Sequence, residues 1–482
     1  MSTVLAFDLG ASGGRAIKAV FSDGSFHYEE VHRFNNVPVE KNGTLYWDFQ
    51  TLIAEVHAGI EKAGKFDGIG FDTWGVDFGL LDKNGRLIGL PVHYRDARTN
   101  GISKKAAAVL EPEELYRETG NQIMDINTLF QLSALRGKNP DLFEKAEHLL
   151  FMPDLFAYSL GARPVCEYTI ASTSQMFNAS ARTWSIPVLT AFGIPRKLFA
   201  PFAQSGTITG IYKNAKIIAI AGHDTQCAVA AMPRVSESIG QSVFLSCGTW
   251  SLLGTELDAP VLSAESMYAG LSNELGANKK INYLKNIIGL WLIQESRREW
   301  KREGRDYSFN DLEKSAGEAK ALQCFIDPDD PSFTQPGNIP GRVIDYCRRT
   351  GQYVPQTPGE IMRCIYESLV LKYRFTVEQL ENMTGRKFTE FHMLGGGVKD
   401  RSLCQFTADC CGITVIAGPV EATALGNIII QLSALGDIAD IDEGRKLIAG
   451  TESLKTYIPA PSVDWESGFK RYMSLLSSQN KE

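Results

Sequence analysis

Apolar and polar positions at the beginning of the chain follow a regular order of strand, turn and strand. Short apolar runs at residues 4–8, 15–21 and 26–34 predict three strands. A polar, glycine-rich turn at residues 10–14 separates the first two. The chain is therefore expected to open with an antiparallel meander whose first turn is rich in glycine.

Helix-like and strand-like segments then continue to alternate, which is typical of an α/β fold. Apolar residues recur at helical spacing over residues 50–63, and residues 68–73 again have the pattern of a strand. The best-marked helix covers residues 358–383, because Thr357 can act as its N-cap and Glu360 completes a capping box.

The opening pattern returns in the middle of the chain. Residues 243–254 again form an apolar strand, a glycine turn and an apolar strand, which suggests an internal duplication. The polar, helix-breaking stretch 233–240 directly precedes this repeat. We therefore predict two domains, residues 1–236 and 237–482, with residues 477–482 as a frayed tail.

Composition argues against several classes of partner. The 482 residues carry 49 basic and 56 acidic side chains, a net charge of −7, so no strongly basic nucleic-acid-binding face is indicated. No apolar run approaches the ~18 residues of a membrane span. The N-terminus also lacks the pattern of a signal peptide. A cytoplasmic protein without nucleic-acid or membrane partners is expected, and nothing in the sequence indicates an oligomeric state.

The nine cysteines are scattered along the chain, which favours a reducing compartment. Neither a Cys-x-x-Cys nor a His-x-x-x-His pair occurs, so a zinc site is not expected. Cys347 and Cys364 lie 17 residues apart and could pair if their surroundings allow, but separate reduced thiols are the favoured interpretation.

Three glycine-rich turns follow strands, at residues 8–15, 246–251 and 395–397. Backbone N–H groups in such turns can approach phosphate oxygens, and Arg15 could neutralise charge. A single turn of this kind is more often only a turn, and both the Walker and the dinucleotide-binding patterns are absent. The combination in both halves favours a phosphate ligand. Asp8, at the exit of an apolar strand, is the kind of residue that holds a hydrated Mg²⁺.

Asp224 lies just past an apolar strand, at the start of a predicted helix. A carboxylate there can take a proton from a substrate hydroxyl, and the helix N-terminus helps to keep it ionised. From position alone, however, an ordinary helix N-cap is the favoured interpretation. His223 is likewise more often a helix-entry residue than a catalyst.

Two further segments carry polar groups beside aromatic residues. Residues 72–77 place Trp74 between two carboxylates and next to Gly75, which suits a sugar, although a strand end with a partly buried tryptophan explains the pattern equally well. The nonapeptide from Asn286 to Gln294 has an amide at each end, and taken alone it predicts a core helix.

Together these motifs resemble the FGGY carbohydrate kinases, over almost the entire chain. The matching segments are residues 4–15, 32–36, 70–78, 89–101, 223–225, 246–251, 284–292 and 417–422. The resemblance implies an α/β fold of two duplicated actin/hexokinase-like (ribonuclease H-like) domains. It also implies a five-stranded mixed sheet with flanking helices in each domain, and an active site in the cleft between the domains.

The resemblance also implies roles for individual residues. The expected nucleotide-binding residues are Ala11, Ser12, Gly13, Gly14, Arg15, Gly248, Thr249, Gln294 and Gly396. The expected sugar-binding residues are Gly75, His223, Asp224, Thr225 and Asn286. Asp224 would be the general base, which overrides the N-cap interpretation, and Asp8 would hold Mg²⁺ through water.

Two positions depart from the pattern of the most similar members, which usually carry serine where Gly13 and Cys247 stand. Each change removes a hydroxyl donor while leaving the backbone N–H groups in place. The expected consequence is a changed ATP affinity at most.

The implied activity is transfer of a phosphoryl group from Mg·ATP to O1 of L-rhamnulose, with a sugar and ATP as small-molecule partners. A kinase for another ketose, such as L-fuculose or D-xylulose, is the nearest alternative. A non-catalytic sugar- or nucleotide-sensing protein on the same fold is the alternative from another class. The presence of Asp8, Asp224 and Thr249 argues against a non-catalytic protein.

Overall fold

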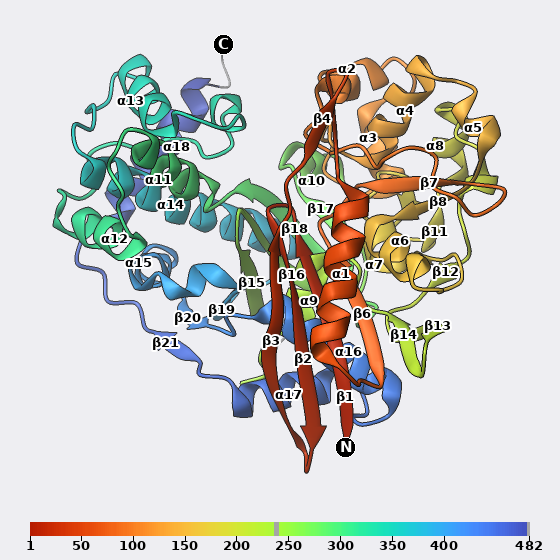
Figure 1. Ribbon diagram of the computed structural model, residues 1–482. Coiled ribbons are helices and arrows are strands. Elements are labelled where there is room, and N and C mark those ends of the chain that lie inside the picture. Colours follow the sequence, from red (N-terminus) through yellow and green to blue (C-terminus); the bar gives the residue numbers. More distant parts are fainter. Residues whose placement is uncertain (236–240, 480–482) are drawn as a thin grey trace. The chain divides into compact units, whose positions relative to one another are not determined.

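The computed structural model describes residues 1–235 and 241–479 (Figure 1). Residues 236–240 of the predicted boundary stretch 233–240 lie outside the described residues, as do residues 480–482 of the predicted tail. The C-terminal helix α18 (Trp465–Gln479) includes the first three residues of that tail, so the prediction of fraying from residue 477 is wrong for them. The alternation of strands and helices confirms the α/β class.

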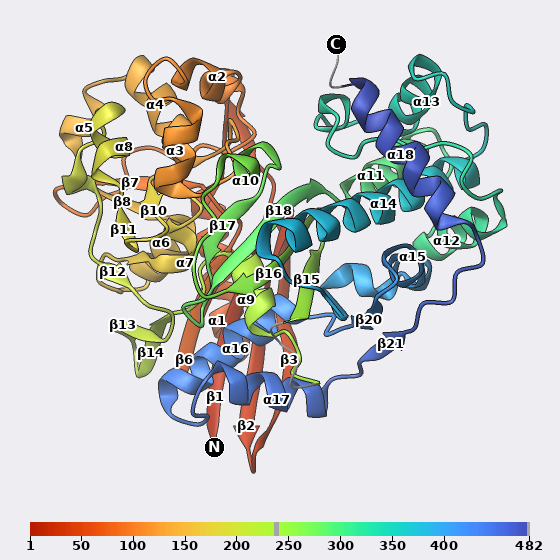
Figure 2. The same ribbon diagram turned by 180° about the vertical axis from the view of Figure 1, so that it is seen from behind.

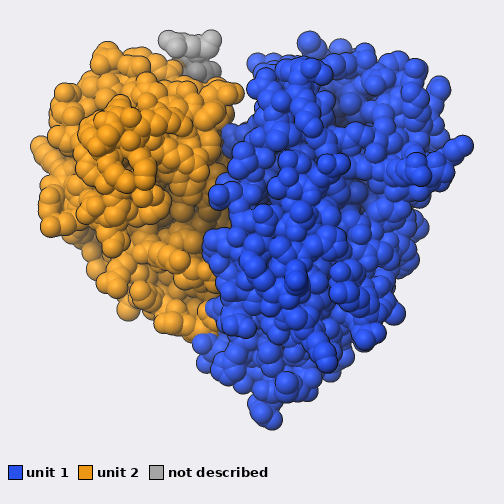
Figure 3. All heavy atoms as spheres, in the orientation of Figure 1, with its two compact units in different colours: residues 1–235, 256–284, 422–451 blue, residues 236–255, 285–421, 452–482 orange. Residues whose placement is uncertain are grey.

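The chain folds into two compact units, coloured blue and orange in Figure 3. Unit 1 contains residues 1–235, 256–284 and 422–451, and unit 2 contains residues 236–255, 285–421 and 452–482. Two later segments of the chain therefore belong to the first unit. The domain division at residues 236 and 237 stays a prediction, because the compact units are discontinuous in sequence.

The central sheet of unit 1 has six strands in the order β13-β14-β6-β1-β2-β3. Their bounds are β13 Thr207–Tyr212, β14 Ala215–Ala219, β6 Gly68–Thr73, β1 Ser2–Gly10, β2 Gly13–Ser22 and β3 Ser25–Asn35. Strands β1, β2 and β3 form the predicted antiparallel meander, whereas β6 pairs parallel with both β1 and β14.

Most of the remaining elements of unit 1 are helices and short strands. The helices are α1 Phe49–Ala63, α2 Ile102–Ala106, α3 Pro112–Thr119, α4 Thr128–Lys138, α5 Leu142–Lys145, α6 Met152–Ser159, α7 Tyr168–Ala171, α8 Ile186–Ala191, α9 Asp224–Ala230, α10 Ala264–Tyr268, α16 Ala422–Leu435 and α17 Ile441–Thr451. The strands are β4 Val39–Lys41, β5 Thr44–Tyr46, β7 Phe78–Asp82, β8 Ala146–Phe151, β9 Cys166–Glu167, β10 Phe177–Asn178, β11 Thr183–Trp184, β12 Phe202–Ala203 and β17 Ser272–Leu275.

Unit 2 repeats the strand arrangement of unit 1. Its strands β15 (Ser242–Cys247), β16 (Trp250–Leu257), β19 (Glu390–Leu394), β20 (Thr414–Ala417) and β21 (Lys455–Tyr457) have the order β16-β15-β19-β20-β21. As in unit 1, a hairpin is followed by two parallel pairs, here β15 with β19 and β19 with β20. The repeat supports the internal duplication predicted from the sequence.

Strands β16 and β18 (Ile281–Ile288) contribute residues to both units. The helices of unit 2 are α11 Trp291–Arg302, α12 Phe309–Glu318, α13 Ile339–Arg349, α14 Pro358–Thr384, α15 Arg401–Cys411 and α18. Both capping-box hydrogen bonds predicted for Thr357 and Glu360 are present at the start of α14. Among the described residues, none of the helices combines the length and the apolar character that a membrane span requires.

Two expectations about these elements are wrong. The sheets have six and seven strands instead of five, because strands are added at their edges. In unit 1 the added strand is β13, which folds back on β14 through a tight turn with Lys213 at φ +54°.

The segment 286–294 is not one helix, since its first residues end β18 and Gly289 separates them from α11. The pair of β-branched residues before that glycine favours the strand.

Helices α1 and α16 cover opposite faces of the sheet in unit 1 (Figures 1 and 2). On one face, Gly59 of α1 lies so close to β1 that an added Cβ would be 2.9 Å from the Phe7 ring. On the other face, α16 sets Asn427 and Gln431 against the two strand glycines Gly70 and Gly68. The Gln431 amide donates to the Leu5 carbonyl at 3.1 Å and to Asn427 Oδ1 at 2.7 Å. Because successive side chains of a strand point to opposite faces of the sheet, the same strands can contact α1 on one face and α16 on the other.

Helix α16 also packs closely on α9 through Gly426. A Cβ at this position would lie 1.8 Å from the backbone carbonyl oxygen of Cys227. Because a backbone atom cannot rotate away, Gly426→Ala should force the helices apart and lower the free energy of unfolding by about 1–3 kcal/mol. Urea denaturation followed by circular dichroism measures this loss.

A glycine of α17 provides the matched control. Gly450 is exposed, and a Cβ there would meet no atom within 4 Å. Gly450→Ala should leave stability unchanged or raise it by up to about 1 kcal/mol, since alanine favours helix. Equal midpoints for the two variants would contradict the close approach of α16 and α9.

Candidate active site

Three carboxylates of unit 1 lie at the carboxyl ends of neighbouring parallel strands. Asp8 in β1 is paired in register with Asp72 in β6, and Asp224 follows β14 at the start of α9. The Thr73 amide donates to the Gly222 carbonyl at 2.9 Å, which brings the ends of β6 and β14 together. In open α/β sheets this edge is where ligands bind.

Asp224 is the first helical residue of α9, and His223 occupies the N-cap position. The Asp224 carboxylate accepts hydrogen bonds from the Thr225 amide at 2.6 Å and from the Thr225 hydroxyl at 3.2 Å. The N-cap interpretation of Asp224 is therefore wrong. With its side chain 34% exposed, the carboxylate is accessible to a ligand.

His223 connects Asp224 to a second carboxylate. Its Nδ1 lies 3.0 Å from Glu274 Oε2 on β17, and its Nε2 lies 3.5 Å from Asp224 Oδ1. Burial lowers the pKa of His223, but Glu274 and then Asp224 outweigh this, so the pKa lies above its ordinary value. The charged imidazolium is favoured between the two acids.

The environment of Asp224 contains opposing effects. Burial raises the pKa of its carboxyl group, the positive charge of His223 opposes that rise, and the negative charge of Asp8 adds to it. The net result is a pKa above the ordinary value of an aspartate. Such a carboxylate is a better proton acceptor than an aspartate in water.

Most of the predicted sugar-binding residues meet in this part of unit 1. A Cβ added at Gly75 would lie 3.3 Å from His223 Nε2, so the two residues are in direct contact. Thr225 is buried beside Asp224. Asn286 is half-buried on β18, in the part of that strand that belongs to unit 2.

Sequence reasoning missed Glu274, which holds His223 and also accepts from the Gln226 amide at 2.7 Å. Gln226 lies in the first turn of α9, and its Oε1 accepts from the Asn282 amide of β18. No local pattern marks Glu274, because it is 51 residues away from His223 in sequence.

Asp72 is completely buried and contacts α16. Its Oδ2 accepts from Asn427 Nδ2 at 2.7 Å, whereas its Oδ1 has no hydrogen-bond partner among the described residues. Burial and then the charge of Asp8 raise the pKa of Asp72 well above its ordinary value. In the sequence, Asp72 and Asp77 belong to one segment, 72–77, and their environments are not distinguished there.

Asp77 has a different environment. Its buried carboxylate accepts from the indole N–H groups of Trp47 at 2.6 Å and Trp74 at 3.0 Å, and from the Tyr94 amide at 3.1 Å. The two indoles lie against each other, with ring centroids 4.0 Å apart. The burial of Trp74 and Asp77 favours the structural interpretation of this pair.

The glycine turn between β1 and β2 is held by packing and by an ion pair. Ala11 and Ser12 form the connection, and an added Cβ at Gly14 would lie 2.3 Å from the Phe34 ring. Arg15 pairs with Asp8 at 2.5 Å. At Gly13 a Cβ would come within 3.0 Å of the Phe34 carbonyl oxygen, so a serine there would press on the neighbouring strand.

The corresponding turn of unit 2 is fixed by the start of α11. The Leu290 amide donates to the Gly248 carbonyl at 3.0 Å, and the Trp291 amide donates to the Thr249 carbonyl at 3.1 Å. The Thr249 hydroxyl donates to Gln294 Oε1 at 3.4 Å. Three of the predicted nucleotide-binding residues therefore lie together.

The glycine triplet after β19 reaches the same sheet edge, because β15 and β19 are parallel and Ser246 is in register with Leu394. A Cβ at Gly397 would lie 2.2 Å from Cys247 Sγ, so this glycine is required for packing. Gly396 is exposed, and a Cβ there would meet no atom within 4 Å. Of the triplet, Gly396 is thus the residue whose backbone is open to a ligand.

Comparison with known proteins connects these features to a family. The N-terminal domain of the FGGY family of carbohydrate kinases matches residues 3–232, and its C-terminal domain matches residues 243–435. A rhamnulokinase of Bacteroides thetaiotaomicron is 40% identical over 98% of this chain and 99% of its own. A rhamnulokinase of Pectobacterium atrosepticum is 39% identical over 98% of this chain and 97% of its own.

Solved structures support the same fold. A ligand-bound xylulose kinase from Lactobacillus acidophilus has a TM-score of 0.79 at 18% identity, covering 99% of this chain and 98% of its own. A Plasmodium falciparum glycerol kinase with ADP has a TM-score of 0.77 at 15% identity, covering 100% and 98%. The expected actin/hexokinase-like fold class is confirmed. The chain belongs to the FGGY family of carbohydrate kinases.

Proposed function

We propose that this protein is a sugar kinase that phosphorylates L-rhamnulose at O1, forming L-rhamnulose 1-phosphate and ADP from ATP. The observation that carries the proposal is the identity of about 40% to proteins named rhamnulokinase over nearly the whole length of both chains. The accessible carboxylate of Asp224, next to His223 and Gly75, supports a site at which a hydroxyl group loses its proton.

In the proposed reaction, Asp224 acts as the general base. It takes the proton of the sugar hydroxyl while the hydroxyl oxygen attacks the γ-phosphorus of ATP in line. The new O–P bond forms as the bond from the γ-phosphorus to the bridging oxygen breaks, and ADP leaves with that electron pair. The transition state is loose, so positioning and charge stabilisation supply most of the catalysis.

The carboxylates at the sheet edge fit a hard divalent cation such as Mg²⁺. Asp8 and Asp72 offer the oxygen donors that Mg²⁺ prefers, and the buried Oδ1 of Asp72 has no partner among the described residues. Asp8 would hold the ion through water. When bound, Mg²⁺ supplies charge neutralisation for the phosphates.

The proposed nucleotide site uses backbone groups together with a few side chains. Ala11 to Arg15 would approach the phosphates, and Gly248, Thr249, Gln294 and Gly396 would bind the nucleotide from unit 2. The hydrogen bonds that fix the Gly248–Thr249 turn to α11 support this assignment, because a pre-organised turn can bind a ligand without rearrangement. The nine cysteines are free thiols in the structure, which supports a reducing compartment such as the cytoplasm.

Loss of the base tests the mechanism. Asp224→Asn should lower kcat by about 10²–10⁴-fold, because the amide cannot accept the proton. A coupled assay of ADP release with L-rhamnulose measures the effect. Asp23→Asn, in the exposed β2–β3 turn, is the matched control and should keep normal turnover. Near-normal turnover of the Asp224 variant with every sugar would refute the assignment.

The pH dependence tests the contact between His223 and Glu274. Activity should fall as the pH drops through the pKa of Asp224, and this acid limb should lie above the ordinary pKa of an aspartate. Glu274→Gln removes the negative charge that raises the pKa of His223, so less imidazolium faces Asp224. The pKa of Asp224 should then rise further and move the acid limb to higher pH.

The measurement is kcat/KM as a function of pH for the wild type and the Glu274 variant. Glu118→Gln provides the control, since Glu118 accepts hydrogen bonds from Asn178 and Ser185 rather than from His223. Its profile should coincide with that of the wild type. An acid limb that stays in place in Glu274→Gln would show that His223 does not tune the base.

A panel of ketoses tests the substrate. L-rhamnulose should give the highest kcat/KM in the ADP-release assay, ahead of L-fuculose and D-xylulose. A preference of more than tenfold for another ketose would replace L-rhamnulose as the substrate. Binding of both ligands without turnover of any sugar would instead favour a sensing protein.

A further inference from the structure

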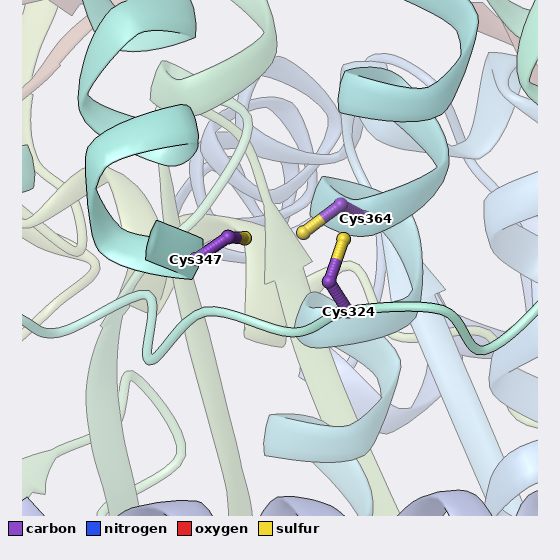
Figure 4. Close-up of side chains that lie close together, drawn as sticks. All are labelled: Cys324, Cys347 and Cys364. Carbon is purple, nitrogen blue, oxygen red and sulfur yellow. The ribbon is translucent and has the colours of Figure 1, made fainter. Parts of the chain in front are cut away.

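Three cysteines of unit 2 converge from separate segments of the chain (Figure 4). Cys347 lies on α13, Cys364 lies on α14, and Cys324 lies in the irregular segment between α12 and α13. Their Sγ atoms are all within 4.8 Å of one another, and Figure 4 shows the three side chains directed toward a common point. All three side chains are buried, with 0–3% of each residue exposed.

We propose that Cys324, Cys347 and Cys364 form a binding site for one thiophilic d¹⁰ metal ion, Zn²⁺ or Cu⁺, held by three thiolates. Thiolate sulfur is the ligand that selects these ions. Metal–sulfur bonds of about 2.3 Å in a trigonal arrangement place the sulfurs about 4 Å apart. The observed spacing therefore requires only a small contraction to close on an ion.

The surroundings favour a cation over three unpaired thiolates. Arg363, the basic residue next to Cys364 on α14, is already paired with Glu367 at 2.5 Å. Three buried thiolates would repel one another, so a cation between them would be stabilising.

The site is held in place by hydrogen bonds that do not involve the sulfurs. The Phe325 amide, next to Cys324, donates to Gln352 Oε1 at 2.9 Å, and the Ile326 amide donates to the Ser368 hydroxyl at 2.9 Å. These contacts fix the irregular segment against α14 and against the residues that follow α13. A bound ion would fasten the same three segments and would have a structural role, as closed metal sites do.

The simpler interpretations are three packed thiols, or one disulfide with a spare thiol. Packing alone does not require three sulfur atoms to converge. In the part of the chain that the structure describes, the three-cysteine cluster is the one group of three or more potential metal ligands whose ligand atoms all lie within 4.8 Å of one another. The remaining six cysteines do not take part in it. Both simpler interpretations predict that the reduced protein binds no metal at this site.

Cadmium titration of the full-length, fully reduced protein tests the proposal. The ultraviolet sulfur-to-cadmium charge-transfer absorbance should saturate at one Cd²⁺ per chain, and Cu⁺, or Zn²⁺ in excess, should displace it. Cys324→Ser should weaken Cd²⁺ binding by more than about 100-fold, since loss of a ligand exceeds the effect of losing an outer-shell partner. Cys410→Ser, a buried cysteine of α15 outside the cluster, should bind Cd²⁺ like the wild type.

A second readout on the wild type covers the case of a variant that fails to fold. Cd²⁺ should raise the Tm and should protect Cys324, Cys347 and Cys364, but not Cys411, from alkylation in mild urea, as mapped by peptide mass spectrometry. No charge-transfer absorbance, equal binding in Cys324→Ser, or protection of other cysteines instead would overturn the proposal. A disulfide within the cluster, in protein that binds no metal after reduction, would overturn it in favour of a redox pair.

Discussion

Placing three carboxylates at one sheet edge is the constraint on which unit 1 depends. The parallel register of β1 and β6 sets Asp8 beside Asp72, and β14 delivers Asp224 to the same edge. Burial and the charge of Asp8 raise the pKa values of Asp72 and Asp224, so holding these acids ionised here opposes folding. Folding to this arrangement therefore requires a compensating partner for each acid.

Each compensating partner comes from a different part of the chain. Arg15 of β2 pairs with Asp8, Asn427 of α16 donates to Asp72, and His223 lies beside Asp224. The need for Asn427 gives a physical reason why residues 422–451 belong to unit 1, although they lie far along the sequence. The close contact of Gly426 with α9 lets α16 approach the sheet edge, where Asn427 donates to Asp72.

Local signals allowed much of the fold to be predicted, whereas the partners of the site needed tertiary structure. The capping box of α14 and the opening meander depend on residues a few positions apart, so the sequence contains them. Position alone favoured an N-cap over a general base for Asp224, and the family resemblance reversed that preference. No periodic pattern in the sequence marks Glu274, Asn427 or the three-cysteine cluster. Their partners lie 17 to several hundred residues away along the chain.

Opposing influences on Asp224 explain how one aspartate can be both ionised and basic. Burial and Asp8 make the carboxyl group more basic, while the His223 imidazolium keeps the negative form populated. Glu274 sustains that imidazolium from the far side of the ring, and Gln226 fixes Glu274 in turn. Without His223 the carboxylate would tend to be protonated, and without Asp8 and burial it would have a lower proton affinity. The proton affinity of Asp224 is thus a property of the whole chain of contacts rather than of Asp224 alone.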